Sequence, residues 1–363
     1  MSQIVPENVN RAPPKEILSL AEFEDLARAC LPVAAYEYLA SGAADENTVR
    51  WNREAYDLIR LRPRVLRDVA SVDTTLTLLG QKMESPILLA PTAFLRAIHP
   101  DGEIAVARGA GAARVTWIVS TATTTPLEEI APHATSPLWF QLYVQSDRSI
   151  TKDLAQRAES VGCEALCLTV DTPVQGPRNR QTRSRFALPA GLTAPYMGEL
   201  VAGRAIADNR RGNVVTWDDV EWLQSVARIP LLIKGILDAD DADRAVAAGV
   251  SGIIVSNHGG RNLDTAPATI VALREVAGRV AGRAPVLVDG GIRRGTDIVK
   301  ALAYGATAVL IGRPYCYGLA VAGADGVSRV IEILQTELAM TMQLIGCRSL
   351  DELNSSVLWS RPG

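Results

Sequence analysis

The sequence predicts a (β/α)8 barrel, in which a closed ring of eight parallel strands is surrounded by helices. Short apolar runs recur along the chain without polar–apolar alternation, which is typical of strands buried on both faces of a parallel sheet. Helix-like stretches lie between these runs, and several of them close with glycine, as helices often do. Strict alternation over eight units favours the barrel, and 363 residues are compatible with one domain of this class.

The elements can be placed in order. The expected strands are 86–90, 116–120, 138–143, 165–170, 230–234, 252–256, 285–289 and 308–312. The helices expected between them include 102–113, 149–162, 216–227, 238–249, 266–280 and 295–305. Thr216 and Asp219 can form a capping box at the start of the third of these helices. An open doubly wound sheet is the alternative, but the eight units and the absence of a GxGxxG motif after the first strand argue against it.

Other segments lie outside this repeat. Residues 1–80 contain helical stretches and are expected to form an N-terminal cap on a barrel of residues 81–350. A long loop rich in arginine, glycine and proline is expected at about 173–214, after the fourth strand, and structureless loops of that length are usually active-site lids or disordered. Residues 328–346 are expected to form a closing helix, and 351–363 a C-terminal tail.

The composition argues against several classes of function. The net charge is −3 and no basic stripe is visible, so nucleic acid is not an expected partner. No apolar run approaches the length of a membrane span, and the N-terminus lacks the pattern of a signal peptide. The five cysteines show no zinc-like spacing, so no metal site is expected, and Cys163 and Cys167 are interpreted as packing residues. A cytoplasmic location fits these features.

Polar or small residues stand at the C-terminal end of every expected strand, which is where barrels of this class build their active sites. In chain order they are Pro91, Thr92, Ala93, Ser120, Gln141, Tyr143, Thr169, Asp171, Lys234, Ser256, His258, Arg261, Asp289, Gly290, Gly291, Arg293, Gly312 and Arg313. One such residue is weak support for a site. Their presence on all eight strands predicts a functional site at this rim.

The loops after the last two strands indicate a phosphate site. "DGGIRRG" (289–295) supplies Arg293 and glycines whose backbone can approach an anion, and "IGRP" (311–314) supplies Arg313. The planar guanidinium group suits phosphate oxygens, and this end of such barrels commonly binds phosphate. The alternative is a tight turn with surface arginines, but two such motifs on successive strands favour phosphate.

Lys234 ends an expected buried strand, although lysine is rarely buried unless it is paired. Three roles are open for it: a Schiff base, a fixed cation beside developing negative charge, or an ordinary lysine that faces solvent at the rim.

His258, in the stretch "SNHGGRNLD", is the natural general base because imidazole titrates near neutral pH. A histidine in this role needs a carboxylate to orient it, and Asp171 is the best candidate. Arg261, three residues further on, can bind a carboxylate. Taken alone, "HGGR" would more often be a turn than a site. His99 and His133 do not stand at strand ends and are interpreted as structural.

Together these motifs resemble those of the FMN-dependent L-2-hydroxy-acid oxidase and dehydrogenase family, to which glycolate oxidase, lactate oxidase and mandelate dehydrogenases belong. The matching stretches are "YEYLASGA", "APTAFLRAIHPDGE", "FQLYV", "LTVDTP", "LIKGI", "SNHGGRNLD" and "LVDGGIRRGTDIVKALAYGATAVLIGRP". The resemblance covers roughly residues 20–350 and is highly specific, because the motifs fall in order on successive strands.

The resemblance implies an FMN cofactor across the mouth of the barrel. Its phosphate would meet Arg313, Gly291 and Arg293, and Lys234 would face the pyrimidine edge of the flavin. The other residues implied to hold the ring are the backbone of Pro91, Thr92 and Ala93 and the side chains of Ser120, Gln141 and Thr169.

The resemblance also implies a substrate site. The substrate carboxylate would be bound by Arg261, Arg178 and Tyr38, and Tyr143 would hydrogen-bond the substrate. His258 would take a proton while two electrons pass to the flavin, and whether the proton leaves carbon or oxygen is open. Positioning of this kind can supply on the order of 7–11 kcal/mol of the barrier.

Some residues depart from the family pattern. Ala122 stands where glycolate-type members carry a large aromatic residue, and Gln175 stands where they carry an apolar one. Both would line the pocket for the substrate side chain, so a lactate- or mandelate-like substrate is expected rather than glycolate. Pro177, Gln181 and Asn262 are further departures.

The leading hypothesis is an oxidase that uses O2 and releases H2O2. The nearest rival is a soluble dehydrogenase that passes electrons to a quinone or a carrier, since the short, mixed segment 187–213 does not resemble the hydrophobic insertion of membrane-bound relatives. A non-redox FMN isomerase, a non-catalytic flavin protein and a peptide-tailoring enzyme are further alternatives. The resemblance also suggests a homotetramer.

Overall fold

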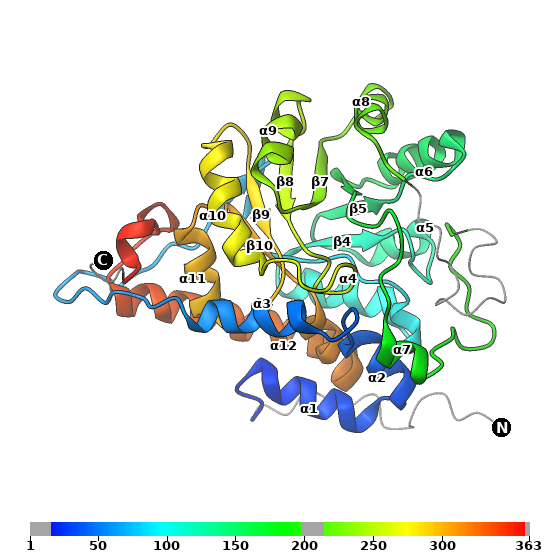
Figure 1. The fold of residues 1–363 in the computed structure, drawn as a ribbon. Coiled ribbons are helices and arrows are strands. Elements are labelled where there is room, and N and C mark those ends of the chain that lie inside the picture. Colours follow the sequence, from blue (N-terminus) through cyan, green and yellow to red (C-terminus); the bar gives the residue numbers. More distant parts are fainter. Residues whose placement is uncertain (1–15, 198–213, 360–363) are drawn as a thin grey trace.

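The computed structural model describes residues 16–197 and 214–359, and its eight parallel strands close into a barrel (Figure 1). The barrel strands are β3 Ile87–Leu89, β4 Thr116–Ser120, β5 Leu138–Leu142, β6 Ala165–Thr169, β7 Leu231–Ile236, β8 Gly252–Val255, β9 Val286–Val288 and β10 Ala308–Ile311. Each strand pairs with its neighbours in sequence, and β10 closes the ring against β3. The predicted fold class and all eight expected strands are confirmed.

Alternate side chains of the strands fill the barrel, as a buried parallel sheet requires. The interior cluster includes Leu88, Ile118, Trp139, Leu232 and Leu310. Its members come from every strand and are at most a few per cent exposed, so the centre of the barrel is a packed core and not a channel. The intervening side chains of the strands pack outward against the helices in a second, larger cluster.

A hairpin that the sequence analysis did not predict closes one end of the barrel. Strands β1 Leu76–Leu78 and β2 Gln81–Met83 are antiparallel, and Gly80 makes the turn with a positive φ of 81°. Leu78 and Met83 join the interior cluster. Because β2 leads almost directly into β3, the hairpin lies at the N-terminal end of the strands, and the rim at the C-terminal ends is left for a site. It spans the expected boundary at residue 80.

The outer helices follow the strands as expected. Their bounds are α4 Gly102–Ala112, α5 Leu127–Ile130, α6 Arg148–Ser160, α8 Trp217–Val226, α9 Ala239–Ala247, α10 Thr269–Val280 and α11 Gly295–Ala303. The capping box of Thr216 and Asp219 at the start of α8 is confirmed. Cys163 and Cys167 are buried and free, which agrees with a packing role.

The N-terminal segment forms three helices: α1 Leu20–Cys30, α2 Val33–Ala40 and α3 Asn47–Asp57. Helix α1 packs against α12, and α3 packs against α10. Figure 1 shows α1, α2 and α3 (dark to mid blue) lying along one side of the barrel, with α7 beside α2. The C-terminal end of α2 therefore comes near the rim where the strands end.

The closing helix begins earlier than predicted. Helix α12 runs from Arg313 to Ile345, so the expected range of 328–346 covers only its second half. The backbone kinks at Ala322 and Gly323, where φ is 56° and the buried His99 ring packs against the glycine. Glycines and alanines in the first half obscure the helical pattern, and the kink separates the two halves.

The expected lid is not without structure. It contains a short helix, α7 Asn179–Arg183, and Phe186 is buried after it. Residues 198–213 of this predicted loop lie outside the described residues. The described part of the C-terminal segment is also ordered against the barrel, because Leu353 and Val357 are buried and Leu358 bridges to Leu61.

Within residues 16–197 and 214–359, no helix combines the length and apolar character that a membrane crossing needs.

Candidate active site

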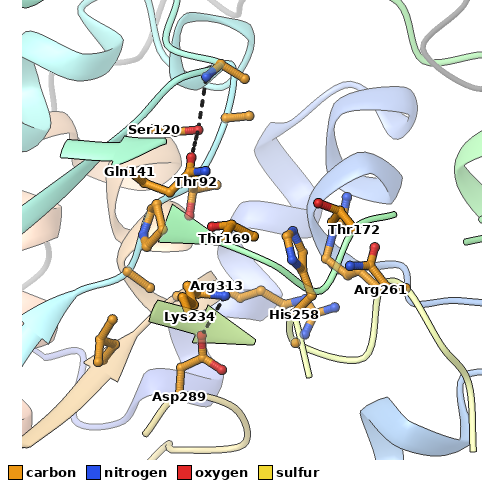
Figure 2. A pocket seen from close by; sticks show the side chains of 18 of the residues that line it. Thr92, Ser120, Gln141, Thr169, Thr172, Lys234, His258, Arg261, Asp289 and Arg313 are labelled. Carbon is orange, nitrogen blue, oxygen red and sulfur yellow. Dashed lines mark hydrogen bonds and ion pairs between the residues drawn. The ribbon is translucent and has the colours of Figure 1, made fainter. Parts of the chain in front are cut away.

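A cavity of about 300 Å³ opens at the C-terminal ends of the strands (Figure 2). It is lined by most of the residues predicted from the sequence: Tyr38, Pro91, Thr92, Ala93, Ser120, Ala122, Gln141, Tyr143, Thr169, Gln175, Arg178, Lys234, His258, Arg261, Asp289, Gly290, Gly291, Arg293, Gly312 and Arg313. Asp171 and Ser256 do not line it and instead lie behind His258 and Lys234, to which they hydrogen-bond. His99 and His133 are not among the lining residues.

Part of the cavity wall was not predicted from the sequence. Thr172, Met197 and Val215 line the cavity beside Gln175. Thr172 directly follows Asp171 at the end of β6, so the strand-end pattern could have found it. Met197 and Val215 belong to the long connection after β6, where strand ends give no signal. Asn262, which was noted only as a departure, also lines the cavity.

His258 and Asp171 form the expected pair. The Nδ1 atom of His258 lies 2.9 Å from Oδ1 of Asp171, and the Asn262 side chain donates to the Asp171 carbonyl at 2.8 Å. Gly235, whose φ is 114°, lets the bulged strand β7 pass close to Asp171. Because Asp171 engages Nδ1, the other ring nitrogen of His258 is available to the cavity.

Burial decides the charge state of this pair. Burial lowers the pKa of His258 below its ordinary value, and the Asp171 carboxylate only partly offsets this effect. Burial acts to raise the pKa of Asp171, but the opposed attraction and hydrogen bond of His258 outweigh it and lower that pKa. At neutral pH the pair is therefore a carboxylate hydrogen-bonded to a neutral imidazole that can accept a proton.

Lys234 is buried in an ion pair. Its Nζ atom lies 2.8 Å from Oγ of Ser256 and 3.3 Å from Oδ2 of Asp289, and Ser256 donates to Asp289 at 2.9 Å. Burial alone would lower the pKa of Lys234, but the carboxylates of Asp289 and Asp171 outweigh it and raise that pKa. Of the roles left open for Lys234, this geometry favours a fixed cation over a Schiff base, and it contradicts a solvent-facing lysine.

Gln141 offers a hydrogen-bond donor without a partner in the described structure. Ser120 donates to Oε1 of Gln141 at 3.2 Å, and the backbone of Thr121 donates to the same atom (Figure 2). Nε2 of Gln141 is buried and has no hydrogen-bond partner in the described structure. A buried amide donor needs an acceptor. The carbonyl oxygens and ring nitrogens at the pyrimidine edge of a flavin meet that need, so this wall fits FMN.

Three partly buried arginines in the cavity carry charge that no described carboxylate neutralises. Arg313 donates to the carbonyls of Leu39 (2.9 Å) and Ser41 (3.1 Å), and Arg261 donates to Ser41 at 2.8 Å. The guanidinium group of Arg293 donates to the carbonyl of Ile292 at 3.0 Å. Within the described residues none of the three side chains forms an ion pair. Partly buried cations of this kind favour anionic ligands.

The pKa values of these arginines reflect the same excess of positive charge. Burial, together with the neighbouring cation of Arg178, lowers the pKa of Arg261 to about 9. Burial also lowers the pKa of Arg293, and Arg313 adds to this effect. A phosphate beside Arg293 and Arg313 and a carboxylate beside Arg261 would relieve the imbalance. Gly290 and Gly291 have positive φ values of 93° and 80°, which glycine adopts without strain, and neither has a side chain that could screen its amide.

Two tyrosines complete the polar lining. The Tyr38 hydroxyl donates to the carbonyl of Ala93 at 3.2 Å, and its ring stacks on Phe186 at 4.3 Å. Burial, and then the Asp171 charge, raise the pKa of Tyr143 to about 12, so Tyr143 is a neutral donor at physiological pH. No group of His, Cys, Asp or Glu side chains in the described parts of the chain could hold a metal ion.

Comparison with known proteins agrees with this geometry. A family model described as FMN-dependent dehydrogenase matches residues 27–360. The chain belongs to this family. It is therefore an FMN-dependent enzyme, as the resemblance to that family implies.

Family members of known structure and activity are similar along nearly their whole length. An L-lactate oxidase from Nostoc sp. is 48% identical over 94% of this chain and 98% of its own. The glycolate oxidase of Spinacia oleracea is 44% identical over 96% and 98% of the two chains. A crystal structure of mandelate oxidase with (S)-4-hydroxymandelic acid superimposes with a TM-score of 0.91, at 42% identity, over 95% of this chain and 99% of that one.

Proposed function

We propose that this enzyme oxidises an L-2-hydroxy acid to the 2-oxo acid, with O2 as the final acceptor and H2O2 as the second product. One observation carries the proposal. The neutral His258, paired with Asp171, shares a single cavity with Arg261, whose charge is uncompensated. A base beside an anion-binding cation is the arrangement that an acid with a neighbouring hydroxyl group requires. The named relatives, which are oxidases of lactate, glycolate and mandelate, support it.

Arg261 and Arg178 are proposed to bind the substrate carboxylate, with Tyr38 beside them. All three line the cavity, and the Nε atom of Arg178 donates to the backbone carbonyl of Arg261 at 3.2 Å, which ties the Arg178 side chain to the loop that carries Arg261. A carboxylate between two arginines is fixed in position and orientation, so one face of carbon 2 is presented to the reacting groups.

His258 is the proposed general base. Its low pKa leaves it neutral at neutral pH, and Asp171 stabilises the imidazolium that forms when it takes the substrate proton. Tyr143, whose raised pKa keeps its hydroxyl protonated, can donate a hydrogen bond to the substrate oxygen. The substrate loses two protons and two electrons in all, and O2 gains them.

When bound, FMN supplies the two-electron acceptor for this reaction. Lys234 and Gln141 would hold the pyrimidine edge, and Arg293, Gly291 and Arg313 would hold the phosphate. The further residues proposed to contact the flavin are Pro91, Thr92, Ala93, Ser120, Thr169, Ser256, Asp289, Gly290 and Gly312. Lys234 places a fixed positive charge where negative charge develops, without moving during the reaction.

A substrate larger than glycolate is proposed. Ala122 and Gln175 both line the cavity, with Met197 and Val215 on the same wall. The small Ala122 leaves room for a side chain on carbon 2, so lactate- or mandelate-like acids are favoured.

One assay tests the function. The yellow protein is mixed anaerobically with glycolate, lactate, mandelate and larger 2-hydroxy acids, and the flavin absorbance is followed. We expect bleaching by lactate or mandelate before glycolate, then peroxide when air is admitted. Bleaching without peroxide would favour the dehydrogenase that uses a quinone or carrier. Bleaching by none of the free acids would contradict the proposal and favour a peptide-tailoring enzyme.

A cytoplasmic homotetramer is also proposed, on the resemblance together with the surface. Leu58, Val65 and Leu66 are exposed on one backbone segment, and Trp359 is exposed on the C-terminal segment that bonds to it. A second copy would cover such side chains. Light scattering on the purified protein measures the mass directly.

A further inference from the structure

Helix α7 carries one of the two arginines proposed to bind substrate, although the helix is only five residues long. Arg178 is its N-cap residue and Arg180 lies within it. A helix this short is not stable by itself, so tertiary contacts must hold it. The position of Arg178 therefore depends on what fixes α7 to the rest of the molecule.

Burial and the neighbouring positive charges disfavour a charged Arg178 side chain in the cavity. Burial lowers the pKa of Arg178, and the cation of Arg313 lowers it further. Arg178 is also the neighbour that contributes most, after burial, to the lowered pKa of Arg261. Until an anion binds, these like charges repel one another, and the repulsion favours movement of Arg178 out of the cavity. The hydrogen bond from Arg178 to the Arg261 carbonyl opposes that movement, and a contact that fixes α7 from outside the cavity would oppose it further.

Arg180 makes such a contact. Its Nε atom lies 2.6 Å from Oε2 of Glu37, and its Nη1 atom lies 3.0 Å from Oε2 of Glu46. Hydrogen bonds to Glu37 first, and then to Glu46, raise the pKa of Arg180 above its ordinary value. The three side chains are only 36%, 20% and 25% exposed, so this is a partly shielded network and not an isolated surface pair.

The acceptors are themselves fixed. Glu37 lies in α2, and Glu46 also accepts a hydrogen bond from the backbone of Gly42 at 2.7 Å. Between them the backbone is left-handed at Ala44, with φ of 45°, and the Ala44 amide donates to the carbonyl of Pro177 at 2.7 Å. Pro177, which directly precedes Arg178, is thus hydrogen-bonded to the turn between α2 and α3. Arg180 contacts the same turn through Glu46.

We propose that Arg180 is a positioning residue: through Glu37 and Glu46 it holds α7 against the N-terminal helices, so that Arg178 stays in the cavity and binds the substrate carboxylate. The inference rests on the proposed function, because it takes Arg178 as a carboxylate ligand. Arg180 does not line the cavity and acts only through α7.

Substitution of Arg180 tests the proposal in the flavin-loaded enzyme. We expect Arg180→Gln to raise KM roughly three- to tenfold with kcat nearly unchanged, because carboxylate binding is lost equally from ground and transition states. The dissociation constant of the 2-oxo acid, measured from its perturbation of the flavin spectrum, should rise by the same factor. Arg180→Lys should recover part of the loss.

Arg183→Gln is the matched control. Arg183 lies on the same helix, is exposed, and forms no ion pair within the described residues. Its KM should equal that of the unaltered enzyme. If Arg180→Gln has the same KM as this control, or if it lowers kcat and leaves KM unchanged, the proposal is overturned.

The acidic partners provide a second route. The double variant Glu37→Gln, Glu46→Gln should raise KM as Arg180→Gln does, and combining all three substitutions should add little, because one interaction is being removed twice. If Arg180→Gln does not fold, the double variant tests the positioning role in its place. An unchanged KM in the double variant then overturns the proposal.

Arg178→Gln separates this inference from the proposed function. A large rise in KM in Arg178→Gln without any rise in Arg180→Gln rejects the positioning role alone. An unchanged KM in Arg178→Gln rejects Arg178 as a ligand of the substrate carboxylate, and it therefore also rejects the positioning role of Arg180.

Discussion

His258 occupies a backbone conformation that few residues adopt readily. Its φ is 57°, in the left-handed region, and its amide donates to Oγ of Ser256 at 3.1 Å. The backbone thus turns sharply straight after strand β8, and the turn directs the ring toward Asp171. Ser256 contacts both His258 and Lys234, so the base and the fixed cation are oriented through one hydroxyl group.

Replacing the base tests its role without disturbing this turn. Asparagine tolerates positive φ, so His258→Asn should fold. We expect the rate of flavin bleaching by substrate to fall about 10²- to 10⁴-fold, because proton abstraction loses its base. Stopped-flow absorbance measures this rate. His133→Asn is the control, since His133 does not line the cavity, and equal rates in the two variants would contradict the assignment.

The pH dependence follows from the same residue. Burial lowers the pKa of His258 from 6.5, so the neutral base persists into mildly acidic solution. The acid limb of kcat/KM should therefore lie below pH 6.5, with activity lost as the pH falls through the lowered pKa. In Asp171→Asn the carboxylate that raises this pKa is gone, so the limb should move to still lower pH. A limb above 6.5 in the unaltered enzyme would contradict this account.

At the scale of elements, strand β7 carries a charge network into the barrel wall. Lys234 and Asp289 are each less than a tenth exposed, and Ser256 lies between them. A buried pair of this kind contributes little net stability, but removing one partner is costly because the other charge stays buried. The network links the ends of three neighbouring strands, β7, β8 and β9, so the proposed flavin contact of Lys234 should depend on all three.

Lys234→Met keeps the volume of the side chain and leaves Asp289 unpaired. We expect a loss of roughly 3–5 kcal/mol in the free energy of unfolding, together with loss of bound flavin. Denaturant titration and the flavin-to-protein absorbance ratio measure the two effects. Adding Asp289→Asn should restore much of the stability and none of the flavin binding. The exposed Lys152→Met should change neither quantity.

The strands and helices differ in how well they could be predicted from the sequence. Continuous apolar runs located all eight strands because a parallel strand buried on both faces leaves a strong local signal. The β1–β2 hairpin was missed since its strands are three residues each and its burial depends on the barrel it closes. The first half of α12 was missed because its helical pattern is diluted by glycine and alanine, and α7 because tertiary contacts create it.

The site was more predictable than its surroundings. Strand ends are fixed by the fold, so Lys234 and His258 could be placed in one cavity before the structure was known. The hydrogen-bond partners of the arginines could not be predicted from the sequence. Arg261 and Arg313 bond to backbone carbonyls at the end of α2, which no sequence pattern reveals.

At the scale of the whole molecule, the N-terminal helices and the barrel enclose a region of excess positive charge. The side chains of Arg261, Arg293 and Arg313 are partly buried there without described carboxylate partners, and burial lowers the pKa of the first two. An anion at the phosphate end should therefore stabilise the folded protein.

This can be measured on protein freed of flavin. Inorganic phosphate should raise the unfolding temperature more than sodium chloride of equal ionic strength, by roughly the amount that mass action allows for a specific ligand. Arg313→Gln should remove the difference between the two salts. Equal stabilisation by phosphate and chloride would show that the arginines do not form an anion site.

The carbonyl of Ser41 accepts hydrogen bonds from both Arg261 and Arg313. Because the two arginines share this acceptor, we expect binding at one end of the cavity to affect binding at the other, and thermodynamic linkage requires such an effect on affinity to be equal in both directions. A saturating 2-hydroxy acid should therefore lower the dissociation constant of FMN by the same factor by which FMN lowers the dissociation constant of the acid.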